Sequence, residues 1–178
     1  KLINSVADKI NNDERIKGKV KVVFLENYCV DLAEKIIPAA DVSLQISTAS
    51  TEASGTGNMK LMMNGAVTLA TMDGANVEIF REVGEDNIVI FGMSSDEVIN
   101  RPADYSARRI LENNPALANA VNQIQNGFFG VPNAEFFEVI NDITNANDPF
   151  CVLGDFDAFC KAEDIMDKKY RDTDGWRK

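Results

Sequence analysis

The chain has 178 residues, a formal net charge of −10 and 45% hydrophobic residues. The hydrophobic fraction is sufficient for a packed core and argues against disorder, whereas the negative charge disfavours nucleic acids and anionic membrane surfaces as partners. The complete absence of histidine excludes Ser-His triads, Cys-His pairs and ordinary zinc sites.

Three cysteines, odd in number and far apart in the sequence, favour a reducing cytoplasm over a disulfide framework. No apolar run reaches about 18 residues, and the N-terminus lacks a signal-peptide pattern. We therefore expect no membrane-spanning segment and a cytoplasmic location. A chain of this length forms either one sizeable domain or one piece of a larger protein.

The first half of the chain alternates between helical and strand patterns. Apolar residues at helical spacing predict a helix over residues 1–11, and Asp31 with Glu34 resembles a capping box for a short helix that Pro38 closes. Apolar, β-branched runs predict four strands, at residues 20–25, 42–46, 67–72 and 87–91. Two further helices are expected between the later strands, over residues 57–65 and 74–84. This order predicts an α/β fold in which helices cover both faces of a parallel sheet.

The second half predicts helices and no further strands. Asn114 stands before a proline, which is typical of a helix start. Asn133 is expected to cap a second helix, and Asp155 to begin a third in which Cys160 faces inward.

Residues 52–60, with the sequence Glu-Ala-Ser-Gly-Thr-Gly-Asn-Met-Lys, form a small-residue loop that opens into a helix. Gly55 and Gly57 let the backbone approach a ligand closely. The first N–H groups of the helix lack internal partners and carry the positive end of the helix dipole, so such a position binds anions, most often phosphate. Lys60 lies about one turn beyond it. A phosphate site is therefore one hypothesis for this stretch.

A plainer interpretation stands beside it. A Ser/Thr/Gly run is most often only a loop, and a lysine after it only a solvated charge. The stretch matches neither the Walker phosphate loop nor the dinucleotide fingerprint, because Lys60 stands where the latter requires its third glycine. The pattern alone leaves both interpretations open.

Residues 52–79 (EASGTGNMKLMMNGAVTLATMDGANVEI) resemble the signature region of the α-glucan phosphorylases, the family of glycogen, starch and maltodextrin phosphorylases. The similarity continues through residues 23–28 (VFLENY), 33–41 (AEKIIPAAD) and 87–92 (NIVIFG), and more weakly to Trp176. It covers nearly the whole chain.

The resemblance implies that residues 1–178 are an excised part of the C-terminal, cofactor-binding domain of a two-domain glycosyltransferase-B architecture. The sheet would be Rossmann-like, with an α/β part at about residues 1–100 and a mostly helical part at about 101–178. The N-terminal domain of the enzyme would be missing here, and the full enzyme would be a homodimer.

The resemblance also implies the chemistry. The full enzyme would cleave α-1,4-glucans with inorganic phosphate, giving glucose 1-phosphate, with pyridoxal 5′-phosphate as cofactor. Lys60 would carry the cofactor as a Schiff base, and Thr56 and Gly57 would bind its 5′-phosphate through backbone N–H groups. Tyr28 would lie near that phosphate. Cys29 stands where some members have arginine, and we expect it to be a small buried thiol without a catalytic role.

For the sugar, the resemblance implies that Glu52 accepts a hydrogen bond from a glucosyl hydroxyl. Three neighbouring residues would contact the same sugar through their backbone: Ala53, Ser54 and Gly55. Lys60, Glu52 and Thr56 are thus the candidate catalytic residues, and no metal is expected. The isolated fragment should be inactive and need not retain the cofactor.

Two other classes of function stay open. A nucleotide-sugar-dependent glucan synthase shares the two-domain architecture but has no use for a lysine that binds pyridoxal phosphate. A non-enzymatic module would use the loop of residues 52–60 only for packing.

Overall fold

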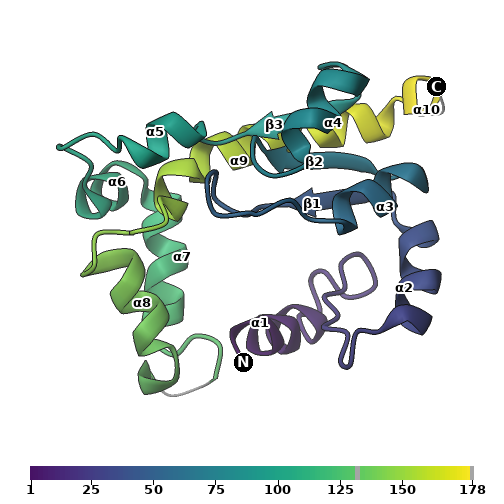
Figure 1. Cartoon of the computed structure of the whole chain (residues 1–178). Coiled ribbons are helices and arrows are strands. Elements are labelled where there is room, and N and C mark those ends of the chain that lie inside the picture. Colours follow the sequence, from purple (N-terminus) through teal and green to yellow (C-terminus); the bar gives the residue numbers. More distant parts are fainter. Residues whose placement is uncertain (131–132, 177–178) are drawn as a thin grey trace. The chain divides into compact units, whose positions relative to one another are not determined.

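The structure is a computed structural model that describes residues 1–130 and 133–176. It divides into two compact units (Figure 1). The first unit comprises Lys1–Cys29 and Ser106–Pro149, and the second comprises Val30–Tyr105 and the chain from Phe150 onward. Within the part of the chain that is described, no helix is long and apolar enough to cross a membrane.

The second unit is built on a three-stranded parallel sheet with the order β1-β2-β3. The strands are β1 (Val42–Gln45), β2 (Val67–Thr71) and β3 (Ile88–Phe91). Val42 lies opposite Val67, and Thr68 lies opposite Ile88. The helical elements of this unit are α2 (Val30–Ile36), the 3₁₀ turn η1 (Ile37–Ala39), α3 (Gly57–Met63), α4 (Asn76–Val83), α5 (Ser95–Ile99), α9 (Val152–Arg171) and α10 (Thr173–Trp176).

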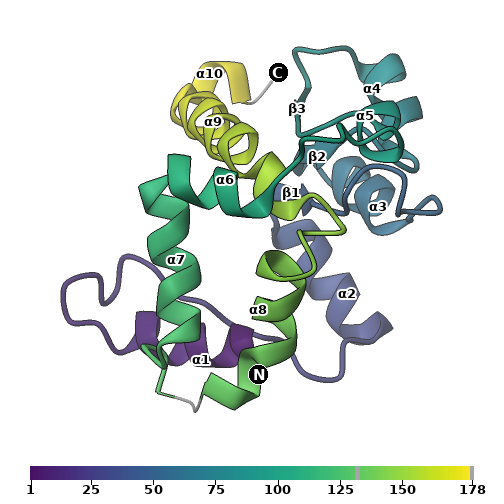
Figure 2. The same cartoon turned by 90° about the vertical axis from the view of Figure 1, so that its left-hand side faces the viewer.

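Helices flank the sheet on both faces. Leu69, Val89 and Phe91 pack with Ala162 and Met166 of α9 into one buried cluster. Because side chains alternate along a strand, the neighbouring positions face the other layer. Figure 2 shows α9 on one side of the sheet, with α3 and α4 on the other. The prediction of an α/β fold with a helix-covered parallel sheet is therefore confirmed.

The predicted elements between residues 30 and 91 are present with small shifts at their ends. The short helix α2 begins at Val30, so Asp31 lies inside its first turn rather than at the cap. Gly84, at the end of the helix predicted over residues 74–84, follows α4 with a φ of 79°, a conformation that glycine adopts readily at helix ends. The sequence analysis missed α5, although Ser94 and Glu97 form a capping box there. Hydrogen bonds from the Ser94 backbone and hydroxyl lower the pKa of Glu97.

The strand predicted at residues 20–25 is wrong. These residues have no strand partner in the described part of the chain, and Val20, Val23 and Phe24 are exposed. The backbone of Val22 instead exchanges two hydrogen bonds with the side-chain amide of Asn11, at 2.8 and 2.9 Å. The side chain thus takes the place that a neighbouring strand would occupy.

In its described residues the first unit contains helices and no strand, and residues 12–29 are irregular. It contains α1 (Leu2–Asn11), α6 (Ala107–Asn113), α7 (Pro115–Gln125), the 3₁₀ turn η2 (Asn133–Phe136) and α8 (Phe137–Thr144). Asn114 caps α7 as predicted, because its side chain accepts a hydrogen bond from the Leu117 N–H at 3.0 Å. The cap predicted for Asn133 concerns a side chain outside the described ones.

The long helix α9 begins earlier than predicted, at Val152, so Asp155 lies buried in its first turn. Ala162 and Met166 face the sheet, and Cys160 is exposed. The prediction that Cys160 faces inward is therefore wrong, because the buried stripe of α9 passes beside it. This helix packs on the sheet of the second unit.

We expect Leu69→Ala to lower the free energy of unfolding of the second unit by about 2–5 kcal/mol, because the removed methyl groups leave a cavity between β2 and α9. The matched control is Leu44→Ala in β1. Leu69 is 0% exposed and Leu44 is 50% exposed, so the control should cost less than about 1 kcal/mol. Urea unfolding followed by the fluorescence of Trp176, which packs against the same cluster, measures both. Equal losses would contradict the placement of this core.

Candidate functional site

The sequence-predicted site lies at the carboxyl edge of the sheet (Figure 1). Residues 46–56, the site loop, connect the end of β1 to α3, and residues 72–75, the support turn, connect the end of β2 to α4. Because β1 and β2 are parallel neighbours, both segments leave the same edge. Ligands of open parallel sheets bind beyond this edge.

The support turn holds the site loop by three hydrogen bonds. One carboxylate oxygen of Asp73, Oδ2, accepts hydrogen bonds from the backbone N–H groups of Thr51 at 2.9 Å and Glu52 at 2.8 Å. The Ala75 N–H donates to the carbonyl of Ser54 at 2.8 Å. Asp73 is only 8% exposed, and the two N–H groups give its carboxylate the partners that a buried acceptor requires.

Gly74 is required at the point where the turn meets the loop. Its φ is +51°, and a Cβ placed on it would lie 2.7 Å from the carbonyl oxygen of Ser54 and 2.9 Å from Cγ of Glu52. Both the backbone conformation and the space therefore favour glycine.

A second set of contacts fixes the start of α3. The buried side-chain amide of Asn58 donates to Oδ1 of Asn76 at 2.8 Å, and Nδ2 of Asn76 donates to the carbonyl of Thr71 at 3.1 Å. Oδ1 of Asn58 accepts from the Met59 N–H at 2.8 Å. Thr56 is the N-cap residue, but its hydroxyl makes no cap hydrogen bond. Asn58 thus ties the helix start to the end of β2.

Glu52 is exposed and its carboxylate is held from one side. The Ser47 hydroxyl donates to Oε2 of Glu52 at 3.1 Å, and the Ser47 carbonyl accepts from the Thr71 hydroxyl at 2.5 Å. Ala53 and Ser54 are also exposed, and Gly55 adopts a φ of +79°. The four residues predicted to contact the sugar therefore form one continuous, accessible segment.

Lys60 is exposed on α3, and its N–H donates to the Thr56 carbonyl at 3.1 Å, one helical turn earlier. Helical side chains lean toward the helix N-terminus, so a lysine at this position is within reach of Thr56 and Gly57. Within residues 1–130 and 133–176, the Lys60 amine makes no ion pair, and the N–H groups of Gly57 and Asn58 have no acceptor. A free amine and free amide donors at one helix start fit a ligand that carries an aldehyde and a phosphate.

Tyr28 and Cys29 belong to the first unit. Tyr28 is 64% exposed, and its predicted approach to the cofactor phosphate stays a prediction. The thiol of Cys29 is exposed, so the prediction that it is buried is wrong. Both residues follow the unpaired segment of residues 20–25, which gives them no sheet to pack against.

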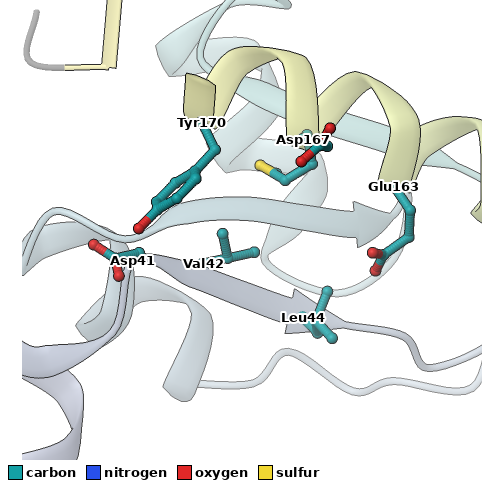
Figure 3. Close-up of a pocket in the computed structure, with 7 residues that line it drawn as sticks. Asp41, Val42, Leu44, Glu163, Asp167 and Tyr170 are labelled. Carbon is teal, nitrogen blue, oxygen red and sulfur yellow. The ribbon is translucent and has the colours of Figure 1, made fainter. Parts of the chain in front are cut away.

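A groove of about 500 Å³ runs along the open edge of β1 beneath α9 (Figure 3). It is lined by Asp41, Val42, Leu44, Glu163, Met166, Asp167 and Tyr170. Three of these side chains are carboxylates, which repel a phosphate, and none of the seven belongs to the site loop. In the described residues, no group of three or more His, Cys, Asp or Glu side chains is arranged to hold a metal. The groove is therefore separate from the candidate phosphate site.

The sequence analysis missed the residues that support the site: Ser47, Asn58, Asp73 and Asn76. Asp73 and Gly74 stand directly after a buried strand, where the sequence analysis predicted only the start of a helix. Their position at the end of the strand next to β1 was the signal that could have identified them, since parallel neighbours end at one edge.

We expect Gly74→Ala to destabilise the second unit by at least about 1 kcal/mol more than Gly84→Ala, since only the former pushes a methyl group into the site loop. Gly84 is a matched control because its φ is +79° and a Cβ there would meet nothing within 4 Å. Thermal unfolding gives the difference. Amide hydrogen exchange should become faster at Thr51 and Glu52 in the Gly74 variant alone, and equal behaviour of the two variants would contradict the packing described.

Comparison with known proteins identifies the family. A model of the carbohydrate phosphorylases matches residues 1–178. The liver form of glycogen phosphorylase from Homo sapiens is 50% identical over 177 residues, which are 99% of this chain and 21% of the relative. The brain form from Mus musculus is 47% identical over 179 residues, 100% of this chain and 21% of the relative. Glycogen phosphorylase from Chlamydia pneumoniae is 42% identical over 179 residues, 100% of this chain and 22% of the relative. The chain thus spans about a fifth of the length of these relatives, and it belongs to the carbohydrate phosphorylase family.

Proposed function

We propose that this chain is the cofactor-holding part of an α-glucan phosphorylase, which degrades glycogen or maltodextrin with inorganic phosphate to glucose 1-phosphate. The observation that carries the proposal is the exposed Lys60 beside an ordered small-residue loop, in a chain that matches the family model from end to end. The family membership supports pyridoxal 5′-phosphate as the cofactor of the full enzyme.

The proposed site supplies one partner for each end of the cofactor. The Lys60 amine would hold the cofactor at its aldehyde group. The N–H groups of Thr56 and Gly57 receive the 5′-phosphate, as helix starts do for anions. When bound, the cofactor supplies a phosphate whose second pKa near 6 suits proton transfer at neutral pH.

The sugar half of the proposed site is the segment from Glu52 to Gly55. Ser47 occupies Oε2 of Glu52, so the other carboxylate oxygen is available to a glucosyl hydroxyl. The backbone of Ala53, Ser54 and Gly55 borders the same sugar. A fixed acceptor discriminates among sugars, because an analogue that lacks the hydroxyl leaves the acceptor unpaired.

The remaining parts of the proposal concern the whole enzyme. We infer that residues 1–178 are part of the Rossmann-like, C-terminal domain of a glycosyltransferase-B architecture, with the glucan and inorganic phosphate bound between that domain and an N-terminal domain. The full enzyme is a homodimer in this proposal. We place the enzyme in a reducing cytoplasm, because the three cysteines of this chain are odd in number and far apart in the sequence.

We expect pyridoxal phosphate, followed by borohydride reduction, to label Lys60. Peptide mass spectrometry should locate the label there, and Lys60→Ala should abolish it. Lys35→Ala is the matched control, because Lys35 is an exposed lysine on another seven-residue helix of the same unit, and labelling of Lys60 should persist in it.

Pyridoxal, which lacks the phosphate, should label Lys60 at least about tenfold more slowly, because it forgoes the helix-start amides. Equal labelling by the two aldehydes, or equal labelling of Lys35 and Lys60, would support the non-enzymatic module. Binding of a nucleotide sugar without any labelling would support the glucan synthase.

We expect the purified 178-residue chain to form no glucose 1-phosphate from maltoheptaose and inorganic phosphate. The cofactor phosphate and the substrate phosphate must lie in contact, which requires strong cationic surroundings. The stretch of residues 52–60 supplies one cation, Lys60, in a chain whose net charge is −10. A coupled assay for glucose 1-phosphate measures this, and measurable formation would overturn the division of the site between this chain and other parts of the enzyme.

A further inference from the structure

We propose that Asp73 is a positioning residue for the sugar half of the site: its carboxylate aims Glu52 at the substrate, independently of the segment that holds the cofactor. The inference rests on the proposed function and adds to it a residue that is buried, touches no substrate and acts through the backbone of the site loop.

The first argument is the bond to Glu52 itself. Oδ2 of Asp73 accepts the Glu52 N–H at 2.8 Å and the Thr51 N–H at 2.9 Å. The two bonds fix the peptide planes on either side of Thr51, and with them the direction in which the Glu52 side chain leaves the backbone. Hydrogen bonds to a charged acceptor are stronger than those between neutral groups.

The second argument is that Glu52 lies between two anchor points. On its N-terminal side, Asp73 holds residues 51 and 52, and on its C-terminal side the Ala75 N–H holds the Ser54 carbonyl at 2.8 Å. The Ser47 hydroxyl then holds one oxygen of the carboxylate at 3.1 Å. An exposed loop residue is pre-organised for a ligand when hydrogen bonds fix the backbone on both sides of it and also fix its side-chain carboxylate.

The third argument is the separation of this support from the cofactor half. The start of α3 is held by the Asn58 and Asn76 amides and the Thr71 carbonyl. In the described part of the chain, no hydrogen bond joins the Asp73 carboxylate to residues 56–60. Asp73 and Asn76, three positions apart, therefore support different halves of the site.

The test uses the holoenzyme that contains this chain, loaded with pyridoxal phosphate. Asp73→Ala should raise KM for the glucan at least about tenfold, as expected for the loss of hydrogen bonds to a charged group. Its borohydride-trapped label at Lys60 should stay at the wild-type level. Asp73→Asn keeps an acceptor oxygen and should return KM to within about threefold of wild type. Asn76→Ala should show the reverse pattern, with weaker cofactor retention and a KM close to wild type in the loaded fraction.

The matched control is Asp155→Ala. Asp155 is also buried, at 7% exposure, and its Oδ1 accepts the Met93 N–H at 2.8 Å beyond the carboxyl end of β3. The Asp155→Ala enzyme should be less stable to unfolding but have an unchanged KM for the glucan. This result would separate a general loss of packing from a change in the orientation of Glu52.

Two results would overturn the inference. An unchanged KM in Asp73→Ala, with normal labelling of Lys60, would reject this inference and leave the proposed function standing. Absence of labelling in the wild-type holoenzyme would reject both the proposed function and this inference. If Asp73→Ala does not fold, Asp73→Glu replaces it, because it keeps the charge but moves the carboxylate by one methylene group relative to the N–H groups of Thr51 and Glu52. A higher KM in this variant, with normal labelling, supports the inference, and an unchanged KM rejects it.

Discussion

Two backbone N–H groups, those of Thr51 and Glu52, converge on one carboxylate oxygen of Asp73, and the order of the site loop depends on this contact. A loop of small and polar residues has no apolar core of its own, while ordering its backbone costs about 1–2 kcal/mol per residue. The loop therefore takes its order from a neighbour that is already fixed. The support turn is such a neighbour, because it follows directly on β2, the central strand of the sheet.

The same dependence extends to the helix that carries Lys60. Helix α3 has seven residues, and helices this short are marginal in isolation because nucleation is unfavourable. Its N-cap residue, Thr56, contributes no side-chain cap bond, and Asn58 compensates by bonding both the helix backbone and Asn76. The helix that carries Lys60 is thus held to the sheet by the side-chain amides of Asn58 and Asn76 and not by its own backbone alone.

The sequence predicted those parts of the fold that depend on local pattern. The apolar runs at residues 42–46, 67–72 and 87–91 form the three strands, of which β2 and β3 are largely buried, and Asn114 caps a helix through its own side chain. The run at residues 20–25 has the same composition and forms no strand. Composition reports that a segment suits a pleated, buried surface, but strand formation also requires a partner backbone, which is a tertiary property. The prediction for Cys160 was wrong for a related reason. Which face of α9 is buried depends on where the helix contacts the sheet, and Cys160 lies just outside the buried face that contains Ala162 and Met166.

In the candidate site, too, some residues could be predicted from the sequence and others depend on tertiary contacts. Lys60, Glu52, Thr56 and Gly57 follow from the resemblance, because they lie in one contiguous motif. Their supports do not, because Asp73 acts on residues 21 and 22 positions earlier and Asn76 on a residue 18 positions earlier. In the sequence, an Asp-Gly pair after a strand predicts a turn whatever its carboxylate does. What distinguishes this pair is that the adjacent parallel strand ends in a loop whose N–H groups at Thr51 and Glu52 point to the Asp73 carboxylate. Wherever parallel strands bring such a loop beside a polar turn, the turn residue deserves consideration as part of the site, because the sheet has already placed its side chain within reach.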